Sequence, residues 1–132
     1  MTKATILLAD DDKVTLSILG AGLQRDGYRV LTAMDGLQAI MVAHRTKPDA
    51  IVLDIMMPAG NGLNVLQKLK ASSATQQIPI IAMSSSQDPA LPAQVLAGGG
   101  EFFLPKPVHF TDLRSLLGRL LGALPKVDPT LP

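Results

Sequence analysis

The stretch AIVLDIMMPAGNG, residues 50–62, joins a strand-like apolar run to a charge. Its first four residues are apolar, as in a parallel strand that is covered on both faces. The carboxylate of Asp54 follows directly, and then come two methionines, a proline and a Gly-Asn-Gly turn. Because an unpaired buried charge is strongly unfavourable, Asp54 needs a partner. The stretch therefore indicates a functional site at the end of a buried strand.

The rest of the chain repeats this order of strand and helix. Further apolar runs predict strands at residues 6–9, 29–33, 80–83 and 102–104. Apolar residues spaced three and four apart predict helices at 14–25, 35–45, 63–70, 89–97 and 111–121. We expect Asp35 and Thr111 to cap the second and fifth helices. The alternation predicts an α/β fold, a doubly wound five-stranded parallel sheet of the flavodoxin-like order 2-1-3-4-5.

Length and composition exclude several classes of protein. The 132 residues suit a single domain, which we expect at 1–124, followed by a flexible proline-rich tail at 125–132. No apolar run approaches the roughly 18 residues that span a bilayer. The chain has no cysteine, which excludes disulfides and thiolate metal sites and favours a cytoplasmic location. A net charge of +1 argues against direct binding of nucleic acid or a membrane.

Polar residues follow four of the five predicted strands. Asp10 and Asp11 follow the first, Asp54 the third, Ser84 the fourth, and Lys106 comes just after the fifth. In the expected order these strands are neighbours, so their ends converge at the edge where open parallel sheets bind ligands. Carboxylates without histidine or cysteine favour a hard ion, and we expect Mg²⁺. A metal, a lysine and a hydroxyl would stabilise a phosphoryl group, and the central Asp54 is the candidate nucleophile.

Four segments carry a resemblance to a known family. LLADDD (7–12), VLDIMMPAGNG (52–62), IIAMSSS (80–86) and LPKPV (104–108) resemble the receiver domain of two-component response regulators. The resemblance is collinear and extends over about residues 4–122. It implies that Asp54 accepts a phosphoryl group from a sensor histidine kinase or a phosphotransfer protein. It also implies Mg²⁺ as the cofactor, and no turnover of a separate substrate.

The same resemblance assigns the metal ligands residue by residue. Asp11 matches the acid that ligates Mg²⁺ directly, and Asp10 the acid that acts mainly through a water. Asp54 itself and the backbone carbonyl of Met56 complete the protein ligands. For the methionine, the expectation concerns the carbonyl oxygen and not the sulfur.

The resemblance also implies a conformational switch. Ser84 matches the hydroxyl that turns towards the phosphoryl oxygens, Phe103 the aromatic residue that follows it, and Lys106 the family's lysine. The Lys106–Pro107 bond is expected to be cis. The output partner, which the sequence does not name, would bind the face formed by the fourth helix, fifth strand and fifth helix. The leucine-rich last helix also allows a homodimer.

Two other functions remain open from the residues. A receiver-like scaffold could bind partners without phosphorylation, although all the acids, Ser84 and Lys106 are present. A Mg²⁺-dependent aspartyl-phosphate phosphatase would need a second acid two residues after the nucleophile, where Met56 stands. Nucleotide or flavin binding is disfavoured because no glycine-rich phosphate loop follows the first strand.

Overall fold

A computed structural model describes residues 4–57 and 62–122 of the chain. Strands and helices alternate as β1 (Thr5–Ala9), α1 (Lys13–Arg25), β2 (Arg29–Ala33), α2 (Gly36–Thr46), β3 (Ala50–Asp54), α3 (Gly62–Ala71), β4 (Ile80–Ser84), α4 (Leu91–Ala97), β5 (Phe102–Pro105) and α5 (Phe110–Leu121). The predicted tail at 125–132 lies outside the described residues.

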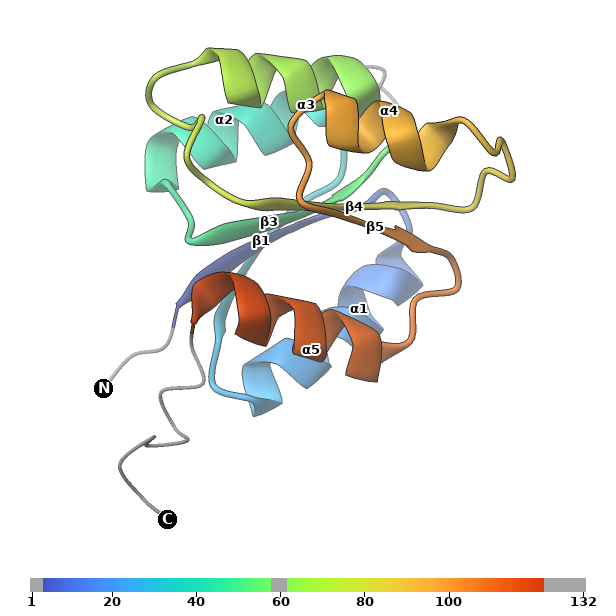
Figure 1. The fold of residues 1–132 in the computed structure, drawn as a ribbon. Coiled ribbons are helices and arrows are strands. Elements are labelled where there is room, and N and C mark those ends of the chain that lie inside the picture. The colour runs from blue at the N-terminus through green and yellow to red at the C-terminus, as the bar shows by residue number, and fades with distance from the viewer. Residues whose placement is uncertain (1–3, 58–61, 123–132) are drawn as a thin grey trace.

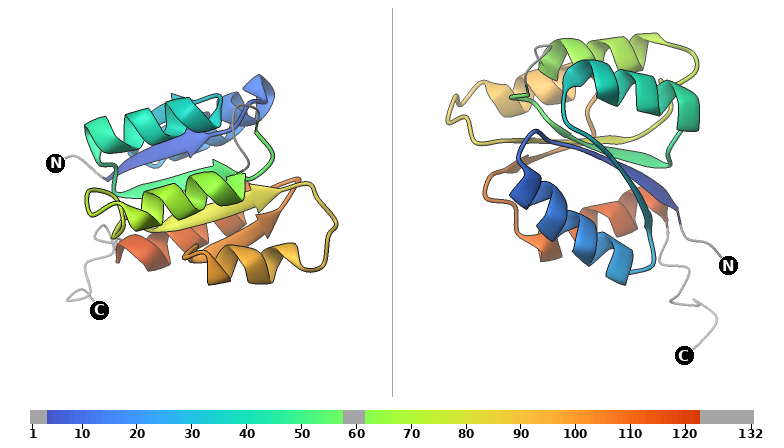
Figure 2. Two further views of the ribbon diagram at one scale, coloured as in Figure 1. Left: turned by 90° about the horizontal axis from the view of Figure 1, so that it is seen from above. Right: turned by 180° about the vertical axis from the view of Figure 1, so that it is seen from behind.

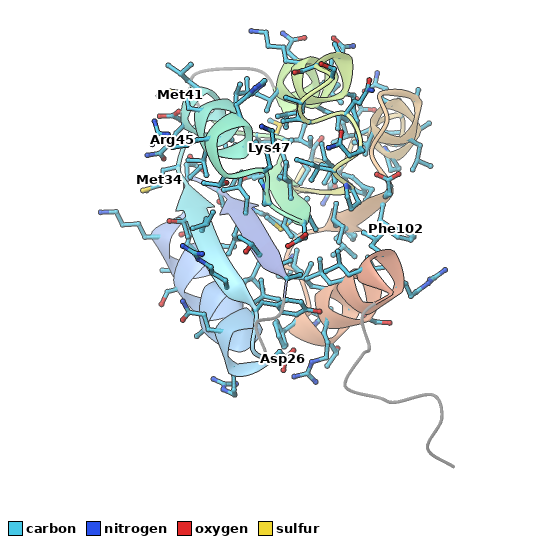
Figure 3. The ribbon with its side chains drawn as sticks, turned by 90° about the vertical axis from the view of Figure 1, so that its left-hand side faces the viewer. Asp26, Met34, Met41, Arg45, Lys47 and Phe102 are labelled. Carbon is cyan, nitrogen blue, oxygen red and sulfur yellow. The ribbon has the colours of Figure 1, made fainter. Side chains whose placement is uncertain are left out.

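The five strands form one parallel sheet in the order β2-β1-β3-β4-β5, which confirms the predicted fold. Helices α2, α3 and α4 cover one face of the sheet, and α1 and α5 cover the other (Figures 1 and 2). Viewed from the β2 side, α1 and α2 flank this edge strand on opposite faces (Figure 3). β3 lies at the centre of the sheet, so Asp54 ends a fully buried strand.

Each face of the sheet carries its own apolar core. Successive residues of β3 alternate between the two cores because side chains alternate across a strand. Ile51 and Leu53 pack beneath α2, α3 and α4, while Ala50 and Val52 face α1 and α5. All four are fully buried. This double burial explains why the strand reads as a continuous apolar run instead of an alternating one.

Of the two helix caps expected from the sequence, Asp35 is confirmed and Thr111 is not. Asp12 caps α1 by accepting the N–H of Val14, and Asp35 caps α2 by accepting that of Gln38. The expectation that Thr111 caps α5 is wrong. The helix already begins at Phe110, after an N-cap residue, His109, that makes no side-chain hydrogen bond. Thr111 therefore lies inside the first turn, beyond the cap position where a side chain can accept the free N–H groups.

Gly62 brings α3 close to the strand end that carries Asp54. Its N–H donates to the carbonyl of Ile55 at 3.0 Å. A β-carbon at residue 62 would collide with the backbone of Ile55, including its Cα and carbonyl oxygen. Since the obstacle is backbone and cannot rotate away, this approach requires glycine.

Candidate functional site

The predicted site residues come together at the carboxyl edge of the sheet. Asp10 directly follows β1, Asp54 ends β3, Ser84 ends β4, and Lys106 follows β5. Ser84 pairs in register with Pro105, and the N–H of Lys106 donates to the Ser84 carbonyl at 2.9 Å. Hydrogen bonds of the sheet therefore set the position of the lysine relative to the acids.

Three carboxylates form a cluster with the geometry of a cation site. Asp10, Asp11 and Asp54 each offer one oxygen, and these oxygens lie within 4.8 Å of one another. Asp10 and Asp54 are buried, whereas Asp11 is exposed. An oxygen-only set with one ligand open to solvent fits Mg²⁺, which retains several waters when bound.

Lys106 connects the two buried acids. Its Nζ lies 2.7 Å from Asp10 Oδ2 and 3.0 Å from Asp54 Oδ2. Burial acts to lower the pKa of the ammonium, but its hydrogen bonds and ion pairs with both carboxylates outweigh burial and leave the pKa raised. The lysine therefore stays charged at neutral pH.

The carboxyl group of Asp10 is fully buried, and its pKa is raised. Burial is the largest cause of its raised pKa, and the negative charge of Asp54 raises it further. Lys106 and the N–H of Asp12, which donates to Asp10 Oδ1 at 2.9 Å, oppose this rise without cancelling it. A further cation beside Asp10 would relieve this unfavourable charge, which is a second reason why the cluster fits a metal.

Both oxygens of Asp54 are oriented by neighbours. Oδ1 accepts the N–H of Met56 at 2.9 Å, and Oδ2 faces Lys106. The Met56 side chain is exposed. The expectation that its carbonyl ligates a metal stays a prediction.

Of the three expected switch residues, Ser84 ends β4, Phe103 lies on the neighbouring β5, and Lys106 directly follows β5. Ser84 is fully buried, and its Oγ accepts the N–H of Ser86 at 3.0 Å. Phe103 is partly buried against the core beneath α2, α3 and α4. The Lys106–Pro107 peptide bond is cis. The structure thus places Ser84 and Lys106 at the site and Phe103 within β5, and the switching roles of all three stay predictions.

An apolar surface that was not predicted from the sequence lies next to Lys106. Val14 and Ile18 on α1 are about two-thirds exposed, and they line a pocket of about 160 Å³ that also involves Pro107 and Val108. The spacing of these two apolar residues, four apart on α1, could have indicated this surface from the sequence. Both residues lie off the helix face that carries the buried Leu19 and Leu23, so they form a second apolar stripe on α1.

Replacement of Asp10 by asparagine is expected to stabilise the metal-free protein at pH 7. Asparagine keeps the acceptor for the Asp12 N–H but removes the disfavoured charge, and we expect a gain of roughly 1 kcal/mol in the free energy of unfolding. Because the folded pKa of Asp10 is raised, its protonated form stabilises the fold below the unfolded pKa of about 3.9, and this contribution disappears as pH rises through the folded pKa.

The stabilisation of Asp10→Asn should therefore be present at neutral pH and vanish below about pH 4. Urea unfolding of both proteins with a chelator, at a series of pH values, measures this difference. A lower stability of Asp10→Asn at pH 7 would show that the ion pair with Lys106 outweighs the burial of the charge.

The family model of the response regulator receiver domain matches residues 6–118, and the chain belongs to this family. The response regulator PleD of Caulobacter vibrioides is 38% identical over 117 residues, which are 86% of this chain and 26% of PleD. The response regulator MprA of Mycobacterium leprae is 34% identical over 94% of this chain and 52% of MprA. The chain thus spans from about a quarter to about half of the length of these relatives.

Solved structures of receiver domains share the fold. The chemotaxis response regulator CheY4 of Vibrio cholerae matches with a TM-score of 0.84 and 29% identity, over 91% of this chain and all of that one. The receiver domain of a Pseudomonas aeruginosa sensor histidine kinase matches with a TM-score of 0.84 and 30% identity, over 92% of this chain and all of that one. That structure has a magnesium ion coordinated in its active-site cleft. Over the described part of the present chain, no helix has the length and apolar character needed to cross a membrane.

Proposed function

We propose that Asp54 accepts a phosphoryl group from a phosphohistidine on a sensor histidine kinase or phosphotransfer protein, with Mg²⁺ as cofactor. The observation that carries the proposal is the fixed Asp54 carboxylate, held between the Met56 N–H and Lys106 and close to two further acids. Membership of the receiver family supports the same function. So does the magnesium ion in the active-site cleft of the related Pseudomonas domain.

The transfer forms a bond between an Asp54 carboxylate oxygen and phosphorus, and breaks the bond between phosphorus and the donor's imidazole nitrogen. Asp10, Asp11, Asp54 and the Met56 carbonyl would hold Mg²⁺, which when bound would supply positive charge to the phosphoryl oxygens. Lys106, already charged and pointing at Asp54, supplies a second positive charge to those oxygens. The backbone N–H of Met56 keeps the carboxylate oriented for attack. These residues position and neutralise the transferred group, and the donor supplies the reactive phosphoryl bond.

Phosphorylation would then alter which partners the domain binds. Ser84 would turn to the phosphoryl oxygens, Phe103 would follow, and the face of α4, β5 and α5 would change its affinity for an output partner or a second copy. Phosphate can shift this equilibrium only through contacts that differ between the two states. A buried Ser84 on the strand next to Asp54 supports such a contact. The cytoplasm, where such kinases present their phosphohistidine, is the expected location.

The function is tested by incubating the protein with acetyl phosphate, with Mg²⁺ or with a chelator, and measuring its intact mass. We expect one added phosphoryl group that requires Mg²⁺ and that hydroxylamine removes, as an acyl phosphate should allow. Absence of labelling would favour the phosphorylation-independent scaffold. Continuous hydrolysis of small phosphate esters would favour the phosphatase.

The exposed stripe on α1 supports a docking surface for the phosphodonor, because Ile18 lines the pocket that Lys106 borders. Ile18→Glu would place a charge on this surface, and we expect transfer from a phosphorylated histidine kinase to slow by about tenfold or more, as for a central interface residue. Labelling by acetyl phosphate, which needs no docking, should not change.

Leu37→Glu is the matched control for Ile18→Glu, since Leu37 on α2 is exposed to a similar extent but lies outside this pocket. Transfer is measured with a panel of phosphorylated kinases, using the one that reacts fastest with the unmodified protein. An equal loss in both variants would place the docking surface elsewhere. A loss of acetyl phosphate labelling in Ile18→Glu would mean that the substitution damages the site itself.

A further inference from the structure

The loop between β4 and α4 contains three hydrogen bonds with the same spacing. The N–H of Ser86 donates to Ser84 Oγ at 3.0 Å, that of Asp88 to Ser86 Oγ at 3.2 Å, and that of Ala90 to Asp88 Oδ1 at 2.9 Å. Each side chain thus accepts from the backbone two residues ahead. We call these three bonds the Ser84 ladder. It runs without a break from Ser84, at the end of β4, to Ala90, the residue before α4.

The start of α4 depends on this ladder. The helix has only seven residues, and its N-cap residue, Ala90, has no side chain that can accept a hydrogen bond. Asp88 provides the missing contacts, since its carboxylate accepts from Ala90 and its carbonyl accepts from Leu91 at 3.1 Å. So short a helix is not stable by itself. Its first turn is therefore held by the ladder and by the burial of Leu91.

Ser84 belongs to both the ladder and the site. Its carbonyl accepts the N–H of Lys106, and Lys106 in turn contacts Asp54. Its hydroxyl is buried at the end of the strand next to Asp54. A change of the Ser84 side chain from one rotamer to another moves Oγ by about 2 Å. Such a movement breaks a 3.0 Å hydrogen bond, so Ser84 loses its bond with Ser86 when its side chain changes rotamer.

We propose that the Ser84 ladder transmits phosphorylation of Asp54 to α4: when Ser84 turns to the phosphoryl group, the Ser86 N–H loses its acceptor and the first turn of α4 loosens. The inference rests on the proposed function. Ser86 and Asp88 are positioning residues in this device, since they act on α4 through backbone N–H groups and do not touch the transferred phosphate. Their side chains set how strongly the phosphorylation of Asp54 is coupled to the loosening of α4.

Amide hydrogen exchange of the whole chain, measured by NMR with and without excess acetyl phosphate and Mg²⁺, tests whether phosphorylation loosens the first turn of α4. In the unmodified protein, exchange at Ser86, Ala90 and Leu91 should rise about fivefold on phosphorylation, the equivalent of one net hydrogen bond. The N–H of Ile51, which donates to the carbonyl of Pro79 far from the loop, should not respond. Intact mass, recorded on the same samples, reports phosphorylation independently.

Single substitutions distinguish an effect of the Ser84 ladder on α4 from a general loss of structure. Ser86→Ala removes the acceptor for the Asp88 N–H, so exchange at Ala90 and Leu91 should already be fast before phosphorylation and should no longer respond, while labelling persists. Ser85→Ala is the matched control and should behave like the unmodified protein, since Ser85 is exposed and adjacent. Asp88→Ala should resemble Ser86→Ala. Asp88→Asn, which retains a side-chain oxygen for the Ala90 N–H, should restore the response.

The outcomes distinguish this inference from the function on which it rests. Labelling without any change in exchange at Ser86 and Ala90 would overturn the ladder and leave the proposed function intact. An unchanged response in Ser86→Ala would also overturn it. Absence of labelling would overturn both, and the mass measurement identifies that case.

Discussion

Asp54→Asn is expected to take up no phosphoryl group from acetyl phosphate and Mg²⁺. The amide has no anionic oxygen to attack phosphorus, so the acceptor itself is removed. Its carbonyl can still accept the Met56 N–H, as Asp54 Oδ1 does at 2.9 Å. Its NH₂ group would then face the Lys106 ammonium, where the carboxylate Oδ2 now lies at 3.0 Å. Intact-mass spectrometry, with a detection limit of a few per cent of the unmodified protein's labelling, measures the loss.

Asp112→Asn provides the matched control for Asp54→Asn. Asp112 is an exposed acid in the first turn of α5, outside the carboxylate cluster. Its variant makes the same chemical change and should be labelled like the unmodified protein. Labelling that persists in Asp54→Asn would show that another residue is the acceptor, and peptide mapping would then identify it.

The fold was predictable from the sequence because the strands are covered on both faces. β3 and β4 are wholly buried and therefore read as unbroken apolar runs that end in a polar residue, Asp54 or Ser84. With strand ends marked in this way, the parallel order also predicted which polar residues meet. The converging acids, serine and lysine thus follow from local patterns combined with one rule of topology.

Other features of the site depend on side-chain geometry that a residue pattern does not contain. The sequence placed Lys106 near the acids but not midway between Asp10 and Asp54. It identified Ser84 without its bond to Ser86, because a serine in a turn has several possible partners. The predicted cap at Thr111 was wrong for a similar reason, since α5 begins one residue earlier.

The three consecutive glycines 98–100 also show that a residue pattern does not contain the packing geometry. They suggest a loose connection into β5, but the structure uses them for close packing. A β-carbon at Gly99 would lie 2.8 Å from Lys70 Cγ, and one at Gly100 would lie 2.6 Å from Val95 Cγ1. Lys70 in turn donates to the carbonyl of Ile78 at 2.7 Å. Only the three-dimensional approach of α3 and α4 distinguishes this tight junction from a flexible one.

Lys106→Met is expected to slow labelling by acetyl phosphate by about 100-fold or more, the usual effect of removing a group that stabilises developing charge. Methionine fills a similar length of apolar side chain but supplies no charge. Asp10 and Asp54 would then face each other without the ammonium that now contacts both at 2.7 and 3.0 Å. The rate is measured by intact mass at saturating Mg²⁺. Lys68→Met, at an exposed lysine in the last turn of α3, is the matched control.

The affinity for Mg²⁺ separates two ways in which Lys106→Met could lose activity. Lys106 neutralises the acids that would ligate the metal, so its removal leaves a more negative cluster that should bind Mg²⁺ at least as tightly as before. A slower rate together with undiminished Mg²⁺ binding, measured by titration calorimetry, would mean that the lysine acts on the transferred phosphoryl group. A parallel loss of rate and Mg²⁺ binding would contradict this role, because Lys106 would then be needed to hold the acids in place for the metal.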